Sequence, residues 1–150
     1  MVAYEGLFFD EEEINKIRSY ELRFLGKVHN KMHCTFVYKP INEELFDELL
    51  NKEINIYLIS YGFDNNNSGF EVLIPEYYMK YYKHYDRNGD IVKPHITSSI
   101  SNNGKSKNTR YLKFTPLKEK VKITGRFGYW IIDDNGNEYL SFKPHKNNLY

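Results

Sequence analysis

His33-Cys34-Thr35-Phe36 and His95-Ile96-Thr97-Ser98 repeat one pattern, a histidine followed two residues later by a threonine. Side chains alternate between the two faces of a strand, so the histidine and the threonine of each stretch point to one face. The residue between them, Cys34 or Ile96, then points to the opposite face. Two such strands predict a site with two-fold character, in which two imidazoles face each other across a cleft.

A pair of imidazoles beside two hydroxyl groups suits the cleavage of a phosphodiester. One neutral imidazole can take a proton from the nucleophile while a protonated one gives a proton to the leaving oxygen. The hydroxyls of Thr35 and Thr97 would stabilise the charge on the phosphate oxygens. The alternative is two unrelated strand histidines, because the pattern fixes only two residues. Two copies in a chain with 5 histidines favour the paired site, so the predicted catalytic residues are His33, Thr35, His95 and Thr97.

Length and composition limit the class of protein and of partner. The chain has 150 residues, which is most simply one domain covering 1–150. Its hydrophobic fraction of 41% and aromatic fraction of 17% predict a packed core rich in rings, not disorder. A net charge of +1 lacks the basic field that long DNA requires, so a small nucleotide is the expected partner. Nothing in the sequence indicates protein partners.

The cysteine content and the N-terminus bear on the cellular compartment. Cys34 is the only cysteine, which excludes a disulfide within the chain, and its inward position predicts a small buried hydrophobe. The N-terminus has neither the basic nor the apolar region of a signal peptide, and no apolar stretch is long enough for a membrane span. We therefore expect a cytoplasmic protein without a membrane partner.

Hydrophobic periodicity and capping signals predict alternating strands and helices. Asp10 is the expected N-cap of the first helix, with Glu13 completing a capping box. Asn42 is the expected cap of the second helix, and Pro40 is expected to end the strand before it. The expected helices span 10–26, 42–52 and the tyrosine-rich segment after Pro75, 75–85. The expected strands span 6–9 (starting as early as 3), 32–38, 54–63, 69–74 and 91–100, followed by a hairpin of 121–133 and 138–142. This order predicts an α+β fold with central antiparallel strands around a cleft and helices outside.

Several segments outside the two histidine stretches are candidates for binding a ligand. The polar stretch 101–110, with Lys105, could contact phosphate or could be an ordinary solvated loop. Aromatic side chains near the strand ends could stack on bases, and Tyr4 and Trp130 are the ones we select. Phe8, Tyr61 and Phe63 are further aromatic candidates. The loop 64–68 has the composition of a movable cover. The tyrosine-rich segment is interpreted as packing, with a base-stacking platform as the alternative.

Metal binding has little support in the sequence. His29 and His33 are four residues apart, a spacing that suits zinc on a helix, but the strand predicted at His33 removes that helix. No other group of histidine, cysteine or acidic residues has convincing ligand spacing. We therefore expect neither a metal nor another cofactor.

The two histidine stretches resemble those of the two-histidine (2H) phosphoesterase superfamily, whose pattern is two His-x-Thr/Ser-x motifs on two pseudo-symmetric lobes. Pro94-His95-Ile96-Thr97, followed by Gly104-Lys105, Asn108 and Leu112, is similar to phage anti-CBASS phosphodiesterases and their RNA-repair-like relatives. The hairpin entry Ile123-Thr124-Gly125-Arg126-Phe127-Gly128 adds to this similarity. Ser98 departs from the pattern, since an apolar residue is commoner there, and the chain lacks the long insertions of some tRNA-ligase relatives.

The resemblance implies a two-lobed fold and a metal-independent phosphodiesterase that linearises cyclic di- or trinucleotide signals of bacterial antiviral defence. Such an enzyme would act in the host bacterial cytoplasm. Two alternatives remain open at this point. One is an enzyme that opens 2′,3′-cyclic phosphates on RNA ends or mononucleotides, which would use the same histidines. The other is a noncatalytic sponge that only binds cyclic nucleotides, although binding alone does not need two acid-base residues.

Overall fold

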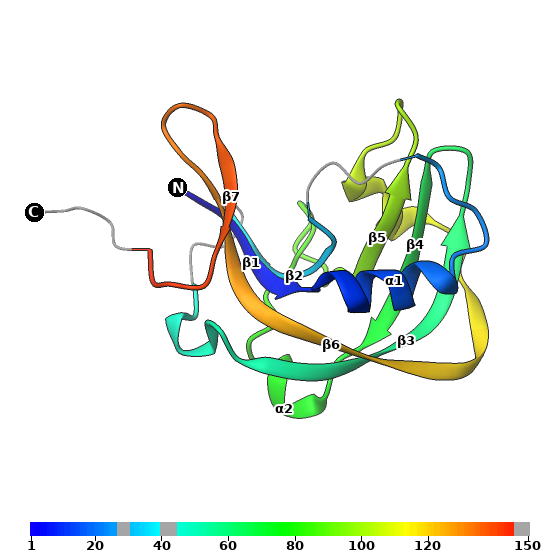
Figure 1. Ribbon diagram of the computed structural model, residues 1–150, viewed down its shortest axis with the longest axis horizontal. Helices are drawn as coiled ribbons and strands as arrows, with labels where there is room; N and C mark the ends of the chain where they lie inside the picture. The colour runs from blue at the N-terminus through cyan, green and yellow to red at the C-terminus, as the bar shows by residue number, and fades with distance from the viewer. Residues whose placement is uncertain (27–30, 40–44, 146–150) are drawn as a thin grey trace, which may run out of the picture.

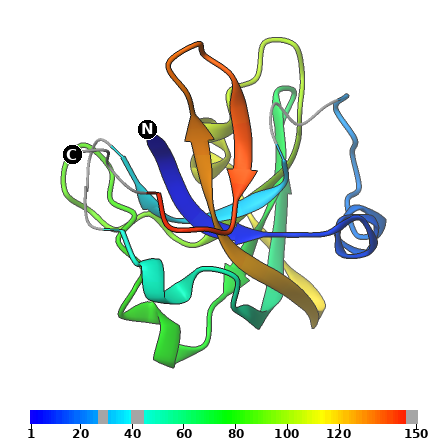
Figure 2. The same ribbon diagram turned by 60° about the vertical axis from the view of Figure 1, so that its left-hand side comes forward.

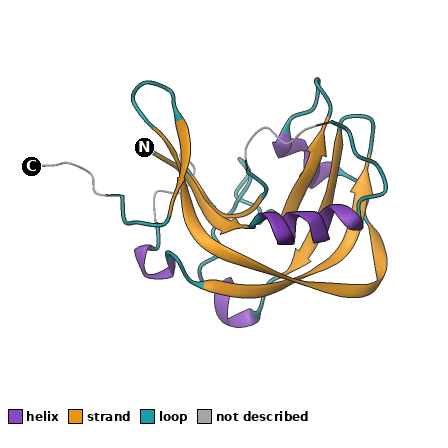
Figure 3. Ribbon diagram, in the orientation of Figure 1, coloured by secondary structure: helices purple, strands orange, loops and turns teal. Residues whose placement is uncertain are grey.

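The computed structural model describes residues 1–26, 31–39 and 45–145, and it shows an α+β fold built on one seven-stranded, mostly antiparallel sheet. The strands follow the order β2-β1-β6-β3-β4-β5, and β7 pairs with β6 beside this path. Their bounds are β1 (Val2–Phe8), β2 (His33–Tyr38), β3 (Glu53–Phe63), β4 (Asn67–Leu73), β5 (His95–Ile100), β6 (Thr115–Ile132) and β7 (Glu138–Ser141). Short helices lie around the strands (Figure 3): α1 (Glu11–Ser19), α2 (Glu76–Met79) and the 3-10 turns η1 (Asp47–Leu49) and η2 (Ser106–Tyr111).

The sheet is nearly closed because its two end strands come together. β6 is long and curved, and it joins β1 on one side to β3 on the other (Figure 1), while β7 lies beside it (Figure 2). β2 and β5 contact each other, although they are not paired in the sheet. Lys83 adds a parallel bridge to Val37, with its N–H donating to the carbonyl of Phe36 at 2.8 Å. The two histidine-bearing strands are therefore neighbours in space, although they stand at opposite ends of the strand order.

Apolar side chains from every part of the sheet fill its interior. Leu7, Phe36, Ile56, Phe70 and Phe127 come from five different strands, and all are fully buried. The alternation predicted for the histidine stretches is observed, since Cys34 and Ile96 are also fully buried in this core. Burial raises the pKa of the Cys34 thiol to about 12, so this side chain is an unreactive core residue, as expected.

The first helix begins as predicted but ends early. The Asp10 side chain accepts a hydrogen bond from the N–H of Glu13 at 3.0 Å, which is the expected cap. The helix stops at Ser19 instead of reaching Gly26, and Phe24 is 59% exposed instead of lying on a buried helical face.

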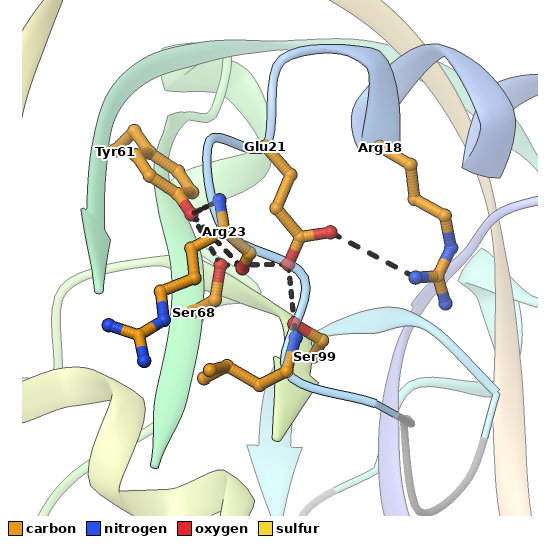
Figure 4. A network of polar contacts seen from close by, with 7 residues as sticks. Arg18, Glu21, Arg23, Tyr61, Ser68 and Ser99 are labelled. Carbon is orange, nitrogen blue, oxygen red and sulfur yellow. Dashed lines mark hydrogen bonds and ion pairs between the residues drawn. The ribbon is translucent and has the colours of Figure 1, made fainter. Parts of the chain in front are cut away.

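The cause of this early end is a buried polar network, drawn in Figure 4. The Glu21 carboxylate accepts hydrogen bonds from the hydroxyls of Ser68 at 2.7 Å and Ser99 at 2.5 Å. The N–H of Leu25 donates to the same Ser99 hydroxyl at 3.0 Å. Tyr61 completes the network through Ser68 at 2.7 Å. These long-range bonds hold the chain in a loop, so the helical pattern of the local sequence is overridden.

The same network corrects the prediction of a movable cover at 64–68. Asn67 and Ser68 belong to β4 and are buried, so only 64–66 form the connection. The Asn67 amide donates to the Lys105 carbonyl at 2.7 Å and to the Thr109 hydroxyl at 3.0 Å. Asn67 and Ser68 are therefore fixed parts of the sheet and not of a movable loop.

Within 45–52, the described part of the second predicted helix, the structure shows only the 3-10 turn η1, and both Pro40 and the expected cap Asn42 lie outside the described residues. The N–H of Phe46 donates to the buried Glu5 carboxyl at 2.7 Å, and Tyr129 donates to the Asp47 carboxylate at 2.5 Å. These bonds fix the chain in a non-helical path.

The tyrosine-rich helix is also shorter than predicted, because α2 ends at Met79 and Lys83 then pairs with β2. Tyr78, Tyr81 and Tyr82 pack in or against the core, as the packing interpretation predicts, whereas Tyr77 is exposed.

The later strands differ from the prediction only in their bounds. The strand expected at 91–100 begins at His95, and Ile91 makes only an isolated bridge to Tyr85. The predicted hairpin is present as β6 and β7, with Gly136 at a φ of 81° in its turn. No helix among the described residues is long and apolar enough to cross a membrane.

Candidate active site

A cavity of about 600 Å³ lies among β1, β2, β5, β6 and η2, within the size range of small-molecule sites. It is lined by all of the predicted catalytic residues and by the selected binding candidates: His33, Thr35, His95, Thr97, Tyr4, Trp130 and Lys105. The first two come from β2 and the next two from β5. The structure thus brings together two stretches that are far apart in the chain.

The two histidine strands are supported in the same way. Thr35 pairs with Gly6 on β1, and Thr97 pairs with Gly69 on β4, with a register shift just before each glycine. A Cβ at Gly6 would lie 2.2 Å from the carbonyl oxygen of Cys34, and one at Gly69 would lie 2.5 Å from that of Ile96. Only glycine allows the supporting strand to approach this closely.

The repeat extends one strand further on each side. Gly6 is paired with Gly128 on β6, and Gly69 is paired with Gly62 on β3. On each side of the cavity, a threonine and two glycines therefore stand at paired positions on three neighbouring strands. This arrangement gives the region around the cavity a local two-fold pattern that the sequence alone does not show, because the glycines are isolated in the chain.

Both imidazoles are oriented by a backbone carbonyl two residues earlier in the chain. The Nδ1 atom of His33 lies 2.8 Å from the carbonyl oxygen of Lys31, and that of His95 lies 2.8 Å from the carbonyl oxygen of Lys93. A carbonyl can only accept, so Nδ1 carries the proton in each ring. In the neutral form, Nε2 is then the nitrogen with a free lone pair, as a general base requires.

Both histidines resist protonation in the unliganded protein. Burial lowers the pKa of His33 to about 4, with a smaller lowering contribution from His95. Burial also lowers the pKa of His95, and the positive charge of Arg110 acts in the same direction. Both rings are accordingly neutral at neutral pH.

The two threonines, although equivalent in register, differ in their hydrogen bonds. Within the described part of the chain, the Thr35 hydroxyl makes no hydrogen bond, so it is available to a ligand. The Thr97 hydroxyl lies 2.7 Å from the Thr109 hydroxyl and 3.2 Å from the Ser106 carbonyl oxygen. Thr97 therefore anchors η2 against β5 in this state, a role that the sequence did not indicate.

An aromatic wall stands beside His33. The Tyr4 ring stacks on the imidazole with centroids 4.4 Å apart, and it lies nearly parallel to Trp130 at 6.3 Å. The Trp130 indole N–H donates to Glu138 at 2.8 Å. Phe8 packs behind this wall and is buried. Of the other candidates for base stacking, Tyr61 and Phe63 are not among the lining residues.

The cavity also contains residues that the motif search missed. His84 and Lys39 line it and were not predicted, whereas Lys107 and Arg110 also line it and belong to the stretch 101–110. His84 stands in the irregular segment after α2, where no motif surrounds it. Arg110 closes the polar stretch 101–110 that the sequence offered as a phosphate contact. His84 reaches the cavity through the pairing of Lys83 with β2, and Arg110 reaches it through the folding of η2 onto β5.

The described residues contain no group of three or more histidine, cysteine or acidic side chains placed to hold a metal ion. His29, considered above as a partner of His33, lies outside the described residues.

Comparison with protein-family models gives no match, and comparison with curated protein sequences gives no significant match.

Proposed function

We propose that this cavity is the active site of a metal-independent phosphodiesterase of the two-histidine type. The observation that carries the proposal is the repeat of one arrangement around one cavity. Each histidine starts a strand, has its Nδ1 fixed by a carbonyl at 2.8 Å, and is followed by a threonine facing a glycine. Two unrelated strand histidines would have no reason to share all of these features and the same cavity. The two-lobed organisation of the superfamily is part of the proposal.

The reaction is an in-line displacement at phosphorus. Water or a ribose 2′-hydroxyl attacks, and its proton passes to the Nε2 of one imidazole. The bond between phosphorus and the leaving oxygen breaks, and that oxygen takes a proton from the other imidazole. Water attack yields a phosphomonoester and a free hydroxyl, whereas 2′-hydroxyl attack yields a 2′,3′-cyclic phosphate and a free hydroxyl. The Thr35 hydroxyl lines the cavity and would donate to a nonbridging oxygen.

The proposed substrate is a cyclic di- or trinucleotide signal of bacterial antiviral defence. The cavity supports this choice through its size of about 600 Å³ and its two unlike sides. The aromatic wall of Tyr4 and Trp130 suits a base, while the side with Lys105, Lys107 and Arg110 suits phosphate. A ligand with more than one base and phosphate uses both sides at once.

The test is incubation of the purified protein with cyclic dinucleotides, cyclic trinucleotides and 2′,3′-cyclic mononucleotides, with and without EDTA, with products read by mass spectrometry. We expect linear products from the cyclic oligonucleotides and no effect of EDTA. Cleavage of cyclic mononucleotides alone would replace the substrate with a 2′,3′-cyclic phosphate. Binding without cleavage would indicate a sponge, and loss of activity on chelation would overturn the metal-free mechanism.

A further inference from the structure

His84 is a third histidine at the cavity, and it has a single polar contact within the described part of the chain. Its side chain is buried at 4% exposure, and its ring centroid lies 6.1 Å from that of His95. The Nε2 atom is 3.4 Å from Nη2 of Arg110, whereas Nδ1 is buried with no hydrogen-bond partner among the described residues. Since the one side-chain hydrogen bond of this buried imidazole in the described structure is to Arg110, the ring is well suited to orient the guanidinium.

Arg110 is a cation without a carboxylate partner in the described structure. Its Nε donates to the Lys107 carbonyl at 2.9 Å, and Nη2 lies against His84. A guanidinium has five N–H donors, so Nη1 and the second donor of Nη2 are left for a ligand. The side chain lines the cavity that contains both catalytic histidines. Its backbone belongs to η2, which Thr97 and Asn67 hold through Thr109 at 2.7 Å and 3.0 Å.

The charge state of His84 agrees with the role of an acceptor. Burial lowers the pKa of His84 to about 3, and the nearby His95 and Arg110 act in the same direction. The ring therefore stays neutral and can accept a hydrogen bond from Arg110 through Nε2. A protonated ring would instead repel the guanidinium.

We propose that Arg110 binds a nonbridging oxygen of the phosphate beside His95, and that His84 is the positioning residue that aims the guanidinium at it. This inference rests on the proposed function for the identity of the ligand. On the β5 side of the cavity, the Arg110 guanidinium becomes the hydrogen-bond donor to the phosphate, because the Thr97 hydroxyl is already hydrogen-bonded to residues of η2. The β2 side has the Thr35 hydroxyl instead. The two sides of the site thus hold the phosphate with different groups, although their backbones are alike.

The first test measures binding of inorganic phosphate by calorimetry, which does not depend on catalysis. Arg110→Gln should weaken the affinity about tenfold or more, the usual effect of losing a hydrogen bond between charged groups. Arg110→Lys should weaken the affinity less, because the positive charge remains although the planar arrangement of N–H donors is lost. Arg87→Gln is the matched control, since Arg87 is exposed and outside the cavity, and it should leave the affinity unchanged.

The second test separates positioning by His84 from a merely structural role. His84→Leu removes the acceptor, and His84→Gln places an amide oxygen near the position of Nε2. We expect His84→Leu to weaken phosphate binding several-fold at an unchanged melting temperature, and His84→Gln to restore most of the affinity. If His84→Leu fails to fold, the phosphate affinity of His84→Gln is compared with that of Arg110→Gln. An affinity near that of the unaltered protein supports the positioning role, and a loss as large as that of Arg110→Gln overturns it. Equal losses in both His84 variants would overturn the positioning role.

Two outcomes distinguish this inference from the proposed function. A protein that cleaves no phosphodiester, but loses phosphate affinity on Arg110→Gln, would refute the function and retain the inference. A protein that cleaves cyclic oligonucleotides, with phosphate affinity and KM unchanged by Arg110→Gln, would retain the function and refute the inference. Failure of the unaltered protein to bind phosphate would also refute it.

Discussion

Binding of a phosphodiester in the cavity should be accompanied by uptake of a proton from solution. The proposed mechanism needs one neutral and one protonated imidazole, yet burial lowers the pKa of His33 to about 4 and also lowers that of His95. At pH 6 only about 1% of a group with a pKa near 4 carries the proton. By the proposed mechanism, the protein without a ligand would lack its general acid, and the negative charge of the bound diester would raise the pKa of an imidazole.

The size of the effect follows from Coulomb attraction between the diester anion and the imidazolium. At about 4 Å and an effective dielectric constant of about 20, the interaction is about 4 kcal/mol. This energy is equivalent to raising the pKa of His33 by about 3, because one pKa unit corresponds to about 1.4 kcal/mol. Most of the complex would then carry the proton at pH 6. Since the bound state has the higher pKa, affinity should be greatest below about pH 4, fall as the pH rises from about 4 to about 7, and level off above that.

The assay is calorimetry of a phosphorothioate cyclic dinucleotide, which resists cleavage, at pH 6 in two buffers of different ionisation enthalpy. We expect uptake approaching one proton per ligand at pH 6 and much less at pH 8. His33→Asn and His95→Asn should each reduce the uptake, and His145→Asn, outside the cavity, is the control. Tight binding at pH 6 with no proton uptake would refute the assignment of a histidine as the general acid.

Three further predictions concern catalysis, packing and the thiol. His33→Ala and His95→Ala should each reduce turnover by at least about 10²-fold, and the double variant should lose far less than the product of the two losses. If steady-state kinetics show that the double variant loses the full product, the two histidines do not act in one step. Gly6→Ala and Gly69→Ala should each lower the free energy of unfolding by about 1–3 kcal/mol in urea titrations, because the added Cβ would lie 2.2 Å or 2.5 Å from a carbonyl oxygen; unchanged midpoints would show that the strands can separate at little cost. Cys34 should react with a thiol reagent only after unfolding, since it is fully buried, and rapid labelling of the native protein would show that β2 opens locally.

Features set by neighbouring residues were predictable from the sequence. The Asp10 cap depends on a residue three positions away, and it forms at 3.0 Å as the capping pattern predicts. The same is true of the strand alternation that turns His33 and Thr35 toward the cavity and Cys34 toward the core. The hairpin turn at Gly136 needs only a residue that accepts positive φ. In each case the deciding energy comes from atoms within a few residues, so a local pattern is enough.

Features set by distant residues were not predictable in this way. α1 ends at Ser19 because the Glu21 carboxylate accepts hydrogen bonds from Ser68 and Ser99, which lie far along the chain. A helical pattern in the local sequence does not contain that information. His84 and Arg110 reach the cavity only through the pairing of Lys83 with β2 and the docking of η2 on β5.

The sequence by itself determined that two histidine and threonine pairs stand on strands and which face each pair occupies, because side-chain alternation is a property of the backbone. Only the tertiary structure decided that β2 and β5, at the two ends of the strand order, close on one cavity. It also decided that Thr35 is available there while Thr97 is bound to η2. These outcomes depend on the curvature of the whole sheet and on contacts between segments far apart in the chain, which no short stretch of sequence encodes.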